Sequence, residues 1–464
     1  MFVGRQEELN KLEHLYAQGG FQMVVVYGRR RVGKTTLIRE FAKDKPALFF
    51  TALEQSDQNN LADFSRAIQV FFELPQGMGS FASWSAAFDY LAQRCAEQPF
   101  VLVFDEFPYA ALRNESLPSA LQIAIDHRFK DTGLFLILCG SNQGFMESEV
   151  LGRKSPLYGR RTSQMRILPL DFIHAKEMFP GLDVQDAFRY YGCFGGVPYY
   201  LSQVNPSLGF QENLARLYFD PAGFLYEEPM ALLRQEFAEP ALYSSILRAI
   251  AGGANKPNEI ANRTGIAQTS LPRYLTNLVN LGIIERQVPF GENQETSRRA
   301  IYCVADACYD FWFHFVMPNV SEIEKGLGRA VAGALSEAEL DDYLGHRFER
   351  VCKEWLVTQA IAGSLPIPAT AVDSWWGTDA KKRVQTDIDV LAADKKGRKL
   401  LIGECKYHNA FNVKEAVRGL QEKHELVAGY DVAGEYVFSK LAVPESASQA
   451  FPEVRFVTLE DIAQ

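Results

Sequence analysis

Three short apolar runs in the first third of the chain, each followed at once by polar residues, predict strands of a buried parallel sheet. The first run ends just before Gly28, the second spans Phe100–Phe104, and the third ends just before Ser141. Parallel strands are covered on both faces, so they read as nearly continuous hydrophobic runs. After the first run, apolar residues recur at helical spacing from Leu37 to Phe41. The pattern therefore predicts a strand, a loop and a helix, in that order.

The pattern changes from Tyr243 onward, where three amphipathic segments are followed by two strand-like runs. The first segment stops at Gly252–Gly253, and the second ends at Gly265, where a turn residue is needed. The third, SLPRYLTNLVNLG, places its leucines on one face, and IIERQVPF and RRAIYCVAD predict two strands of a wing. Three helices followed by a wing resemble a winged helix-turn-helix.

The C-terminal third contains a hairpin whose acids share one face. VQTDIDVLAA alternates with period two, DKKGRK is a turn signal, and LLIGECKY is the return strand. If residues 395–398 form the loop, Asp389 faces Glu404 and Asp387 faces Lys406. An acid opposite an acid is destabilising unless a cation neutralises the pair. The spacing therefore predicts that Asp389 and Glu404 hold Mg²⁺ or Mn²⁺, with Lys406 placed to position or deprotonate water or to neutralise a phosphodiester.

Composition indicates a globular protein of about three domains, since domains usually span roughly 100–200 residues and the chain has 464. With a net charge of −9, any binding to nucleic acid must depend on local basic patches. The seven cysteines are scattered without a CxxC pair, which argues against a zinc ribbon and indicates a reducing, cytoplasmic compartment. The first residues lack the layout of a signal peptide, and no run of about 18 apolar residues predicts a membrane span.

The loop after the first predicted strand carries the chemistry of an ATP site. In such a segment the loop amides and the helix amino terminus bind phosphate, Lys34 reaches the terminal phosphates, and Thr35 ligates Mg²⁺. A glycine-rich turn alone does not explain the Lys-Thr pair. The predicted binding residues of this loop are Gly28, Arg29, Arg30, Arg31, Val32, Gly33, Lys34, Thr35 and Thr36.

Polar residues near the other two runs are predicted to serve the same ligand, because the carboxyl ends of parallel strands converge. Asp105 would hold Mg²⁺ through water, and Glu106 would orient the attacking water. Ser141 would sense the terminal phosphate. Arg160 is the candidate for an arginine supplied to the γ-phosphate, in cis or from a neighbour. The plainer alternatives are solvated acids, a simple turn and surface charge.

The helix-turn-helix segment has a local excess of basic residues, which favours DNA as a partner. Arg273 lies on the candidate recognition helix, and Arg298 and Arg299 lie on the wing. The recognition helix of such a domain often enters the major groove. The alternative is a winged helix that packs against the ATPase domain and touches only protein.

Two family resemblances follow from these motifs. The phosphate loop, FVGRQEEL at the start and GGVPYYL at Gly195–Leu201 resemble AAA-superclass ATPases of the STAND and archaeal type. The Asp…Glu-x-Lys signature resembles the nuclease core of restriction-endonuclease-like proteins. The second resemblance implies a further acid from a preceding helix, for which Glu349 in YLGHRFERVCKEWL is the candidate. The chain has TDID where the nuclease pattern often shows Pro-Asp, so Asp387 remains open as the ligand, although Asp389 fits better.

The layout as a whole resembles prokaryotic, archaeal-type ATPases with a C-terminal restriction-endonuclease-like domain of unknown function. It implies an α/β fold in three parts: a P-loop ATPase domain with a helical lid (1–235), a winged helix-turn-helix (236–310) and a nuclease-like α/β domain (311–464). We expect a cytoplasmic ATPase that acts on DNA, forms a homo-oligomer and cuts DNA with Mg²⁺ or Mn²⁺. Two alternatives stay open: a non-cleaving, nucleotide-gated switch or scaffold with an inert nuclease fold, and an ATPase whose winged helix binds protein.

Overall fold

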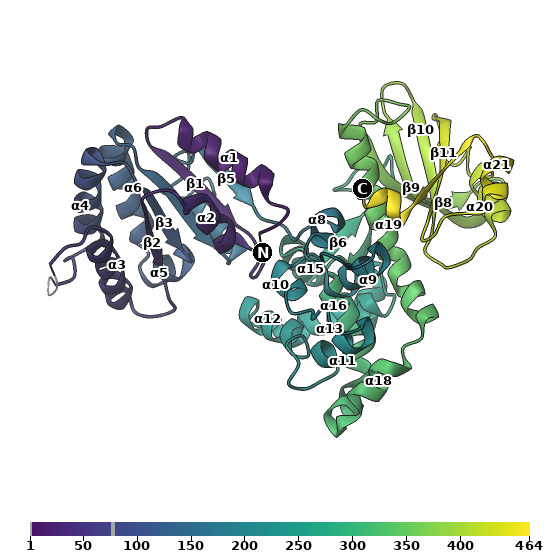
Figure 1. Ribbon diagram of the computed structural model, residues 1–464, viewed down its shortest axis with the longest axis horizontal. Helices are drawn as coiled ribbons and strands as arrows, with labels where there is room; N and C mark the ends of the chain where they lie inside the picture. Colours follow the sequence, from purple (N-terminus) through teal and green to yellow (C-terminus); the bar gives the residue numbers. More distant parts are fainter. Residues whose placement is uncertain (1, 76–78) are drawn as a thin grey trace. The chain divides into compact units, whose positions relative to one another are not determined.

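The computed structural model describes residues 2–75 and 79–464, which divide into two compact units (Figure 1). The first unit contains the residues up to Pro169 together with Val197–Tyr199, and the second contains Leu170–Gly196 and Tyr200–Gln464. The chain therefore passes three times from one unit to the other. Within the described residues, every helix is too short or too polar to cross a membrane.

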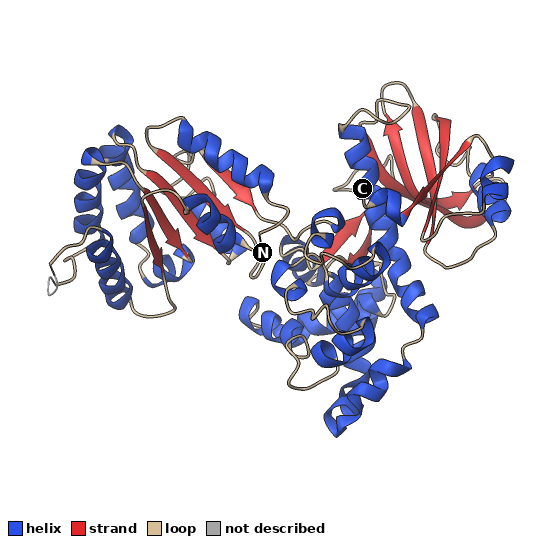
Figure 2. Ribbon diagram, viewed as in Figure 1, coloured by secondary structure: helices blue, strands red, loops and turns tan. Residues whose placement is uncertain are grey.

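The first unit is a five-stranded parallel sheet with helices on both faces (Figure 2). Its strands follow the order β2 (Ala47–Thr51), β3 (Val101–Asp105), β4 (Phe135–Gly140), β1 (Gln22–Tyr27) and β5 (Ser163–Arg166). Its helices are α1 (Gln6–Ala17), α2 (Lys34–Ala42), α3 (Asp57–Phe71), α4 (Trp84–Glu97), α5 (Phe107–Arg113), α6 (Leu117–His127) and α7 (Gln143–Phe145), with short turns of helix at Phe129–Asp131 and Met146–Val150. This is the α/β fold of a P-loop ATPase.

Alternate side chains of β1 explain why both faces of this sheet are covered. Val24 and Val26 belong to one apolar core with residues of α1 and α2. Met23 and Val25 belong to a second core with residues of α3, α4, α5 and α6. The three predicted strands, β1, β3 and β4, and the predicted helix α2 are confirmed. The edge strands β2 and β5 were not predicted.

The second unit begins with helices and a winged helix-turn-helix. The predicted three helices and two antiparallel wing strands are confirmed as α13, α14, α15, β6 and β7. The bounds are α8 (Phe172–Lys176), α9 (Val184–Phe194), α10 (Pro198–Leu201), α11 (Phe210–Tyr218), α12 (Glu228–Glu236), α13 (Pro240–Ala251), α14 (Pro257–Thr264), α15 (Leu271–Asn280), β6 (Ile284–Gln287) and β7 (Ile301–Val304). The first two residues of α10 belong to the first unit. Most of the predicted lid, from Leu170 onward, falls in this unit, so the domain boundaries at 235 and 310 stay a prediction.

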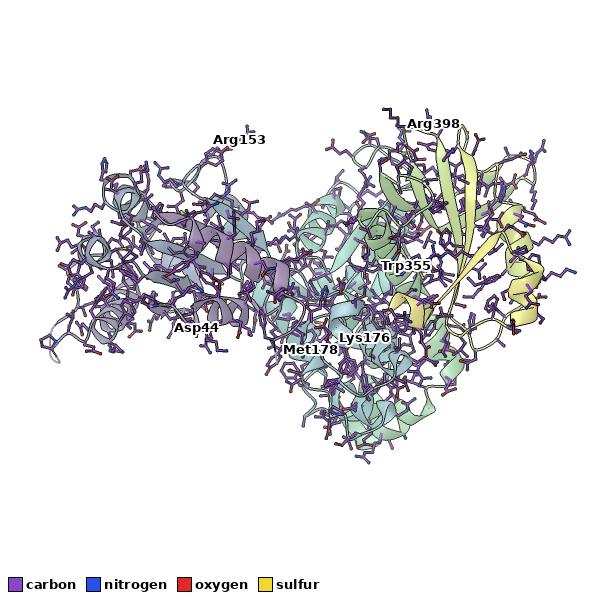
Figure 3. The ribbon with its side chains drawn as sticks, turned by 45° about the horizontal axis from the view of Figure 1, so that its top comes forward. Asp44, Arg153, Lys176, Met178, Trp355 and Arg398 are labelled. Carbon is purple, nitrogen blue, oxygen red and sulfur yellow. The ribbon has the colours of Figure 1, made fainter. Side chains whose placement is uncertain are left out.

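The rest of the second unit is a mixed sheet of order β12-β11-β10-β9-β8 between helices. Trp355 of α19 packs against Tyr436 and Phe438 on one face (Figure 3), while α20 packs with Val437 in the core of the other. The bounds are α16 (Ala307–Phe311), α17 (Val320–Glu322), α18 (Gly328–Ala334), α19 (Glu337–Ile361), β8 (Ala371–Asp379), β9 (Val384–Asp394), β10 (Lys399–Lys406), α20 (Val413–Gln421), β11 (Asp431–Ser439), α21 (Glu445–Ala450), β12 (Val454–Thr458) and α22 (Leu459–Ile462), with irregular helical turns at Trp312–Asn319 and Ile323–Leu327. The assignment of this domain to the restriction-endonuclease-like fold stays a prediction.

Candidate nucleotide and nuclease sites

The phosphate loop lies between β1 and α2 and has a backbone that glycine alone tolerates at Gly28. Gly28 has a φ of 146°, and a Cβ there would lie 2.3 Å from the carbonyl oxygen of Ile167. A side chain at this position would therefore be strained and would also clash. Gly33, with a φ of 93°, is the N-cap of α2, so the unpaired N–H groups of the first turn of α2 follow the loop directly. Such a turn is a ready anion site.

Lys34 is buried in this loop, and its ammonium donates to three neutral oxygens. Nζ lies 2.9 Å from the carbonyl oxygens of Gly28 and Arg29 and 2.9 Å from Oγ of Ser141. Burial lowers the pKa of Lys34. An ammonium held by neutral acceptors next to a helix amino terminus can exchange them for phosphate oxygens, because charged hydrogen bonds are the stronger ones.

Ser141 links this lysine to the acids at the end of β3. Its N–H and its hydroxyl donate to the carboxylate of Glu106 at 3.2 and 2.5 Å, and Thr35 Oγ1 donates to Asp105 at 3.0 Å. Glu106 has a φ of 51°, a left-handed conformation that costs free energy for a residue with a side chain and often marks a functional site. The structure thus brings Lys34, Thr35, Asp105, Glu106 and Ser141 together. Thr35 and Asp105 offer the oxygen ligands that Mg²⁺ prefers.

Two tyrosines fix the arginines of the loop. Arg30 Nη2 donates to the hydroxyl of Tyr109 at 2.6 Å, and the guanidinium of Arg31 lies 5.2 Å from the centre of the Tyr199 ring. Sequence reasoning did not select either tyrosine. The GGVPYYL motif, which contains Tyr199, could have indicated that this residue belongs to the site. No sequence motif marks Tyr109, because its contact with Arg30 depends on how α5 packs.

Arg160 lies before β5 and is held by Asp126 of α6. Its Nε and Nη2 donate to the two carboxylate oxygens at 3.0 and 2.5 Å, and this contact keeps the pKa of Asp126 well below its usual range. Strand β5 runs parallel to β1, and its last residue, Arg166, pairs with Tyr27 at the end of β1. Arg160 therefore lies at the amino end of the strands, whereas the phosphate loop follows their carboxyl end. This placement excludes the predicted route in cis and leaves the route from a neighbouring copy as a prediction.

The candidate DNA-binding arginines fall into two groups. Arg273, near the start of α15, and Arg298, on the wing, have exposed side chains. Arg299 is engaged within the protein, since its Nη1 donates to Glu292 at 2.8 Å and its guanidinium lies 5.9 Å from the Trp375 ring. Arg273 and Arg298 remain candidates for DNA contact, whereas Arg299 would first have to leave these partners.

The wing itself is packed into the C-terminal domain. The N–H of Phe290 donates to the carbonyl oxygen of Ser374 in β8 at 2.9 Å. The Phe290 ring is 5% exposed, belongs to the apolar core of that domain and lies 5.4 Å from the Tyr430 ring. The wing is thus a shared element of two predicted domains rather than a free hairpin.

The C-terminal hairpin has the register that the sequence predicts. Residues 395–398 form its turn, and the ladder runs from Lys399–Asp394 to Gly403–Val390. Just beyond the ladder, two residues after Gly403, the N–H of Cys405 donates to the Asp389 carboxylate at 2.7 Å. This places Asp389 beside Glu404. Asp387 is exposed, and Lys406 bonds to Glu404 rather than to Asp387, contrary to the prediction.

Glu404 is held by two lysines, of which the sequence indicated one. Lys406 Nζ donates to its Oε1 at 2.8 Å, and Lys423 Nζ donates to its Oε2 at 2.7 Å. Burial opposes ionisation of Glu404, but Lys423 and Lys406 outweigh it and lower the pKa of this carboxyl. Lys423 follows α20, and its meeting with β10 depends on tertiary packing that no sequence spacing encodes.

Asp389 has the opposite environment. Burial, together with the neighbouring carboxylates of Glu404 and Glu349, raises the pKa of Asp389 to about 7. Glu349, on α19, also accepts a 3.3 Å contact from His346 Nδ1. Glu404 and Glu349 therefore lie close enough to Asp389 to help raise its pKa. A group of three or more side chains placed to hold a metal ion is absent from residues 2–75 and 79–464.

Comparisons with known proteins agree with the first two parts of this layout. Residues 2–204 match a model described as an ATPase domain predominantly from Archaea, and residues 244–288 match an IclR helix-turn-helix domain. Residues 312–419 match a model for archaeal and bacterial proteins of unknown function. The chain is similar in fold to the Walker-type ATPase paby2304 of Pyrococcus abyssi (22% identical, TM-score 0.53), covering 67% of this chain and 96% of that one.

Two proteins of Methanocaldococcus jannaschii are similar in sequence. The uncharacterized ATP-binding protein MJ0423 is 49% identical over 45 residues, or 10% of this chain and 76% of that protein. The uncharacterized protein MJECL04 is 32% identical over 448 residues, or 95% of this chain and 97% of that protein. With an archaeal-type ATPase domain, a helix-turn-helix and a match that spans nearly the whole of both chains, the protein belongs to the same family as MJECL04.

Proposed function

We propose that the protein binds and hydrolyses ATP to control its action on DNA, and that its C-terminal domain is a Mg²⁺- or Mn²⁺-dependent nuclease. The observation that supports the nuclease is the meeting of Asp389, Glu404 and Lys406 at the end of one hairpin, beside Glu349. Buried acids with opposed pKa shifts are typical of functional sites. The seven free cysteines agree with action in the cytoplasm.

The ATP site divides its work among residues that are already in contact. Lys34 would leave the loop carbonyls for the β- and γ-phosphates, and Ser141 would report the change to Glu106. Thr35 and Asp105 would hold Mg²⁺. Glu106 would orient the attacking water, and Arg160 of a neighbouring copy would face the γ-phosphate.

The nuclease site has a similar division of roles. Asp389 and Glu404 fit a hard divalent cation, because both offer carboxylate oxygens in a largely buried place. A bound divalent cation supplies a Lewis acid and lowers the pKa of bound water. Lys406 would neutralise charge on the phosphodiester. Glu349 would lie beside Asp389 and help keep the pKa of Asp389 raised until a cation arrives.

Plasmid nicking tests the nuclease directly. The wild-type protein, with Mg²⁺ or Mn²⁺ and with ATP or a non-hydrolysable analogue, should convert supercoiled DNA to the open circle. Glu404→Ala should abolish this conversion and leave ATP hydrolysis unchanged, because the ATP site lies in the other unit. Nicking that survives in Glu404→Ala would assign the activity to a contaminant or to another site.

A non-cleaving, nucleotide-gated switch is the second candidate. It is favoured by the two lysines on Glu404, which balance the acid without any metal. If no metal or nucleotide condition gives nicking while ATP is still hydrolysed, this candidate replaces the nuclease. Both candidates require DNA binding through the exposed Arg273, so Arg273→Ala should weaken binding and reduce its salt dependence. If the whole winged helix touches only protein, this variant should have no effect on DNA binding.

A further inference from the structure

The segment after α20 carries ion pairs on consecutive side chains. Glu422 pairs with Lys382 and Glu425 pairs with Lys381, both from the turn between β8 and β9. Two residues before Glu422, Leu420 is fully buried in the core beneath the sheet. The burial of Leu420 therefore holds the backbone of this segment close to the sheet, while the side chains that follow it can still change rotamer.

Lys423 lies in this segment and is directed at the candidate site. Its side chain is 15% exposed, and its Nζ lies 2.7 Å from Oε2 of Glu404. His424, the next residue, contacts Glu435 of β11 at 2.5 Å and so faces a different strand. Of the four charged side chains at residues 422–425, Lys423 is the one that contacts a candidate metal ligand.

Two ammonium groups on one carboxylate exceed what neutrality needs. Lys406 occupies Oε1 of Glu404 and Lys423 occupies Oε2, so both oxygens that a cation would use carry a lysine. A cation arriving at Glu404 therefore competes with these ammonium groups for the carboxylate. Lys406 is the last residue of strand β10, whereas Lys423 is carried by the turn that follows α20, and each reaches Glu404 through a flexible four-carbon stem.

We propose that Lys423 is a second functional lysine of this site, which holds Glu404 until a divalent cation replaces it and then turns its charge to the phosphodiester. The inference rests on the proposed nuclease function. Lys423 acts as a positioning residue: it competes with the cation for Glu404 and keeps a positive charge available once the cation is bound. The effect of Lys423 on cation affinity can be measured without DNA, and its effect on cleavage can be measured by plasmid nicking.

Titration with Mn²⁺ alone, without DNA, tests the competition. Lys423→Met should tighten Mn²⁺ binding roughly fivefold, because a partly buried ion pair no longer opposes it. Lys423→Arg keeps the charge and should return the affinity to that of the wild type. Lys381→Met is the matched control, because Lys381 pairs with Glu425 in the same segment and does not contact Glu404. Glu404→Ala should weaken binding and so identifies the site.

Plasmid nicking by the same variants tests the second role. Lys423→Met should nick at least tenfold more slowly than the wild type in spite of its tighter Mn²⁺ binding, a split that simple misfolding would not produce. If Lys423→Met binds Mn²⁺ no more tightly than the wild type, the inference is wrong, whatever the rate of nicking. The inference is also wrong if the wild-type protein binds no Mn²⁺. Tighter binding in a protein that never nicks DNA would support the competition and reject the nuclease.

Discussion

At the scale of single residues, Asp389 keeps a proton that an ordinary aspartate loses well below neutral pH. Its pKa is raised to about 7 by burial and by Glu404 and Glu349, whereas an aspartate in an unfolded chain ionises near pH 4. The folded protein therefore binds this proton more tightly than the unfolded chain does. The resulting contribution to stability is fully present below about pH 4 and is lost as the pH rises through about 7.

Asp389→Asn should remove this pH dependence. The amide carries no charge and can still accept from the Cys405 N–H, so the variant should be more thermostable than the wild type at pH 8. The difference should shrink toward pH 5, where the wild-type carboxyl is protonated. Thermal unfolding across this pH range measures it. Asp387→Asn is the control, because Asp387 is an exposed acid on the same strand. A variant less stable than the wild type at pH 8 would contradict this account.

A second residue-scale prediction concerns Lys34. Lys34→Ala should lose nucleotide binding and ATP hydrolysis, because the loop then has no ammonium for the terminal phosphates. Fluorescent-nucleotide binding and phosphate release measure the two effects. Lys43→Ala, at the exposed end of the same helix, should behave like the wild type. Unchanged hydrolysis in Lys34→Ala would refute the assignment of this site.

At the scale of elements, the sequence predicted what local patterns encode. Strands β1, β3 and β4 are buried along most of their length and read as apolar runs, whereas the edge strands β2 and β5 are half exposed and give no such run. The hairpin register followed from a turn of known length. Lys423 and the docking of Phe290 could not be predicted, because each joins segments that are far apart in the sequence and meet only through packing.

The docked wing yields a prediction of its own. Phe290→Ala should destabilise the second unit by about 3–5 kcal/mol, because it leaves a cavity in the core that the wing shares with the C-terminal sheet. Denaturant unfolding measures the change. Ile361→Ala is the comparison at an apolar residue of the second unit that is 83% exposed, and it should cost far less. If the wing did not pack against the C-terminal sheet, both substitutions would lower the free energy of unfolding by similar, small amounts.

At the scale of the whole molecule, the position of Arg160 predicts that ATP hydrolysis needs more than one copy of the chain. Arg160→Ala and Lys34→Ala should each be inactive alone, and a mixture should regain part of the activity, because intact sites form where a normal loop meets a normal arginine. Phosphate release from the mixture, compared with the separate variants, is the measurement.

Two controls separate this role of Arg160 from its ion pair. Asp126→Asn removes the partner but keeps the arginine and should remain active. Arg153→Ala, an exposed position in the same segment, should also remain active. Mixtures that stay inactive would show that Arg160 stabilises the fold through Asp126 and has no part in hydrolysis.

The three crossings of the chain between its two units affect how the protein can evolve. Because Val197–Tyr199 belong to the first unit while their neighbours on both sides belong to the second, the ATPase is not one uninterrupted stretch of sequence. A recombination event with a single breakpoint after Pro169 would separate Tyr199 from Arg31, which it stacks upon. We therefore expect the nucleotide site and residues 170–196 to be inherited together, and relatives to exchange whole chains more readily than the ATPase alone.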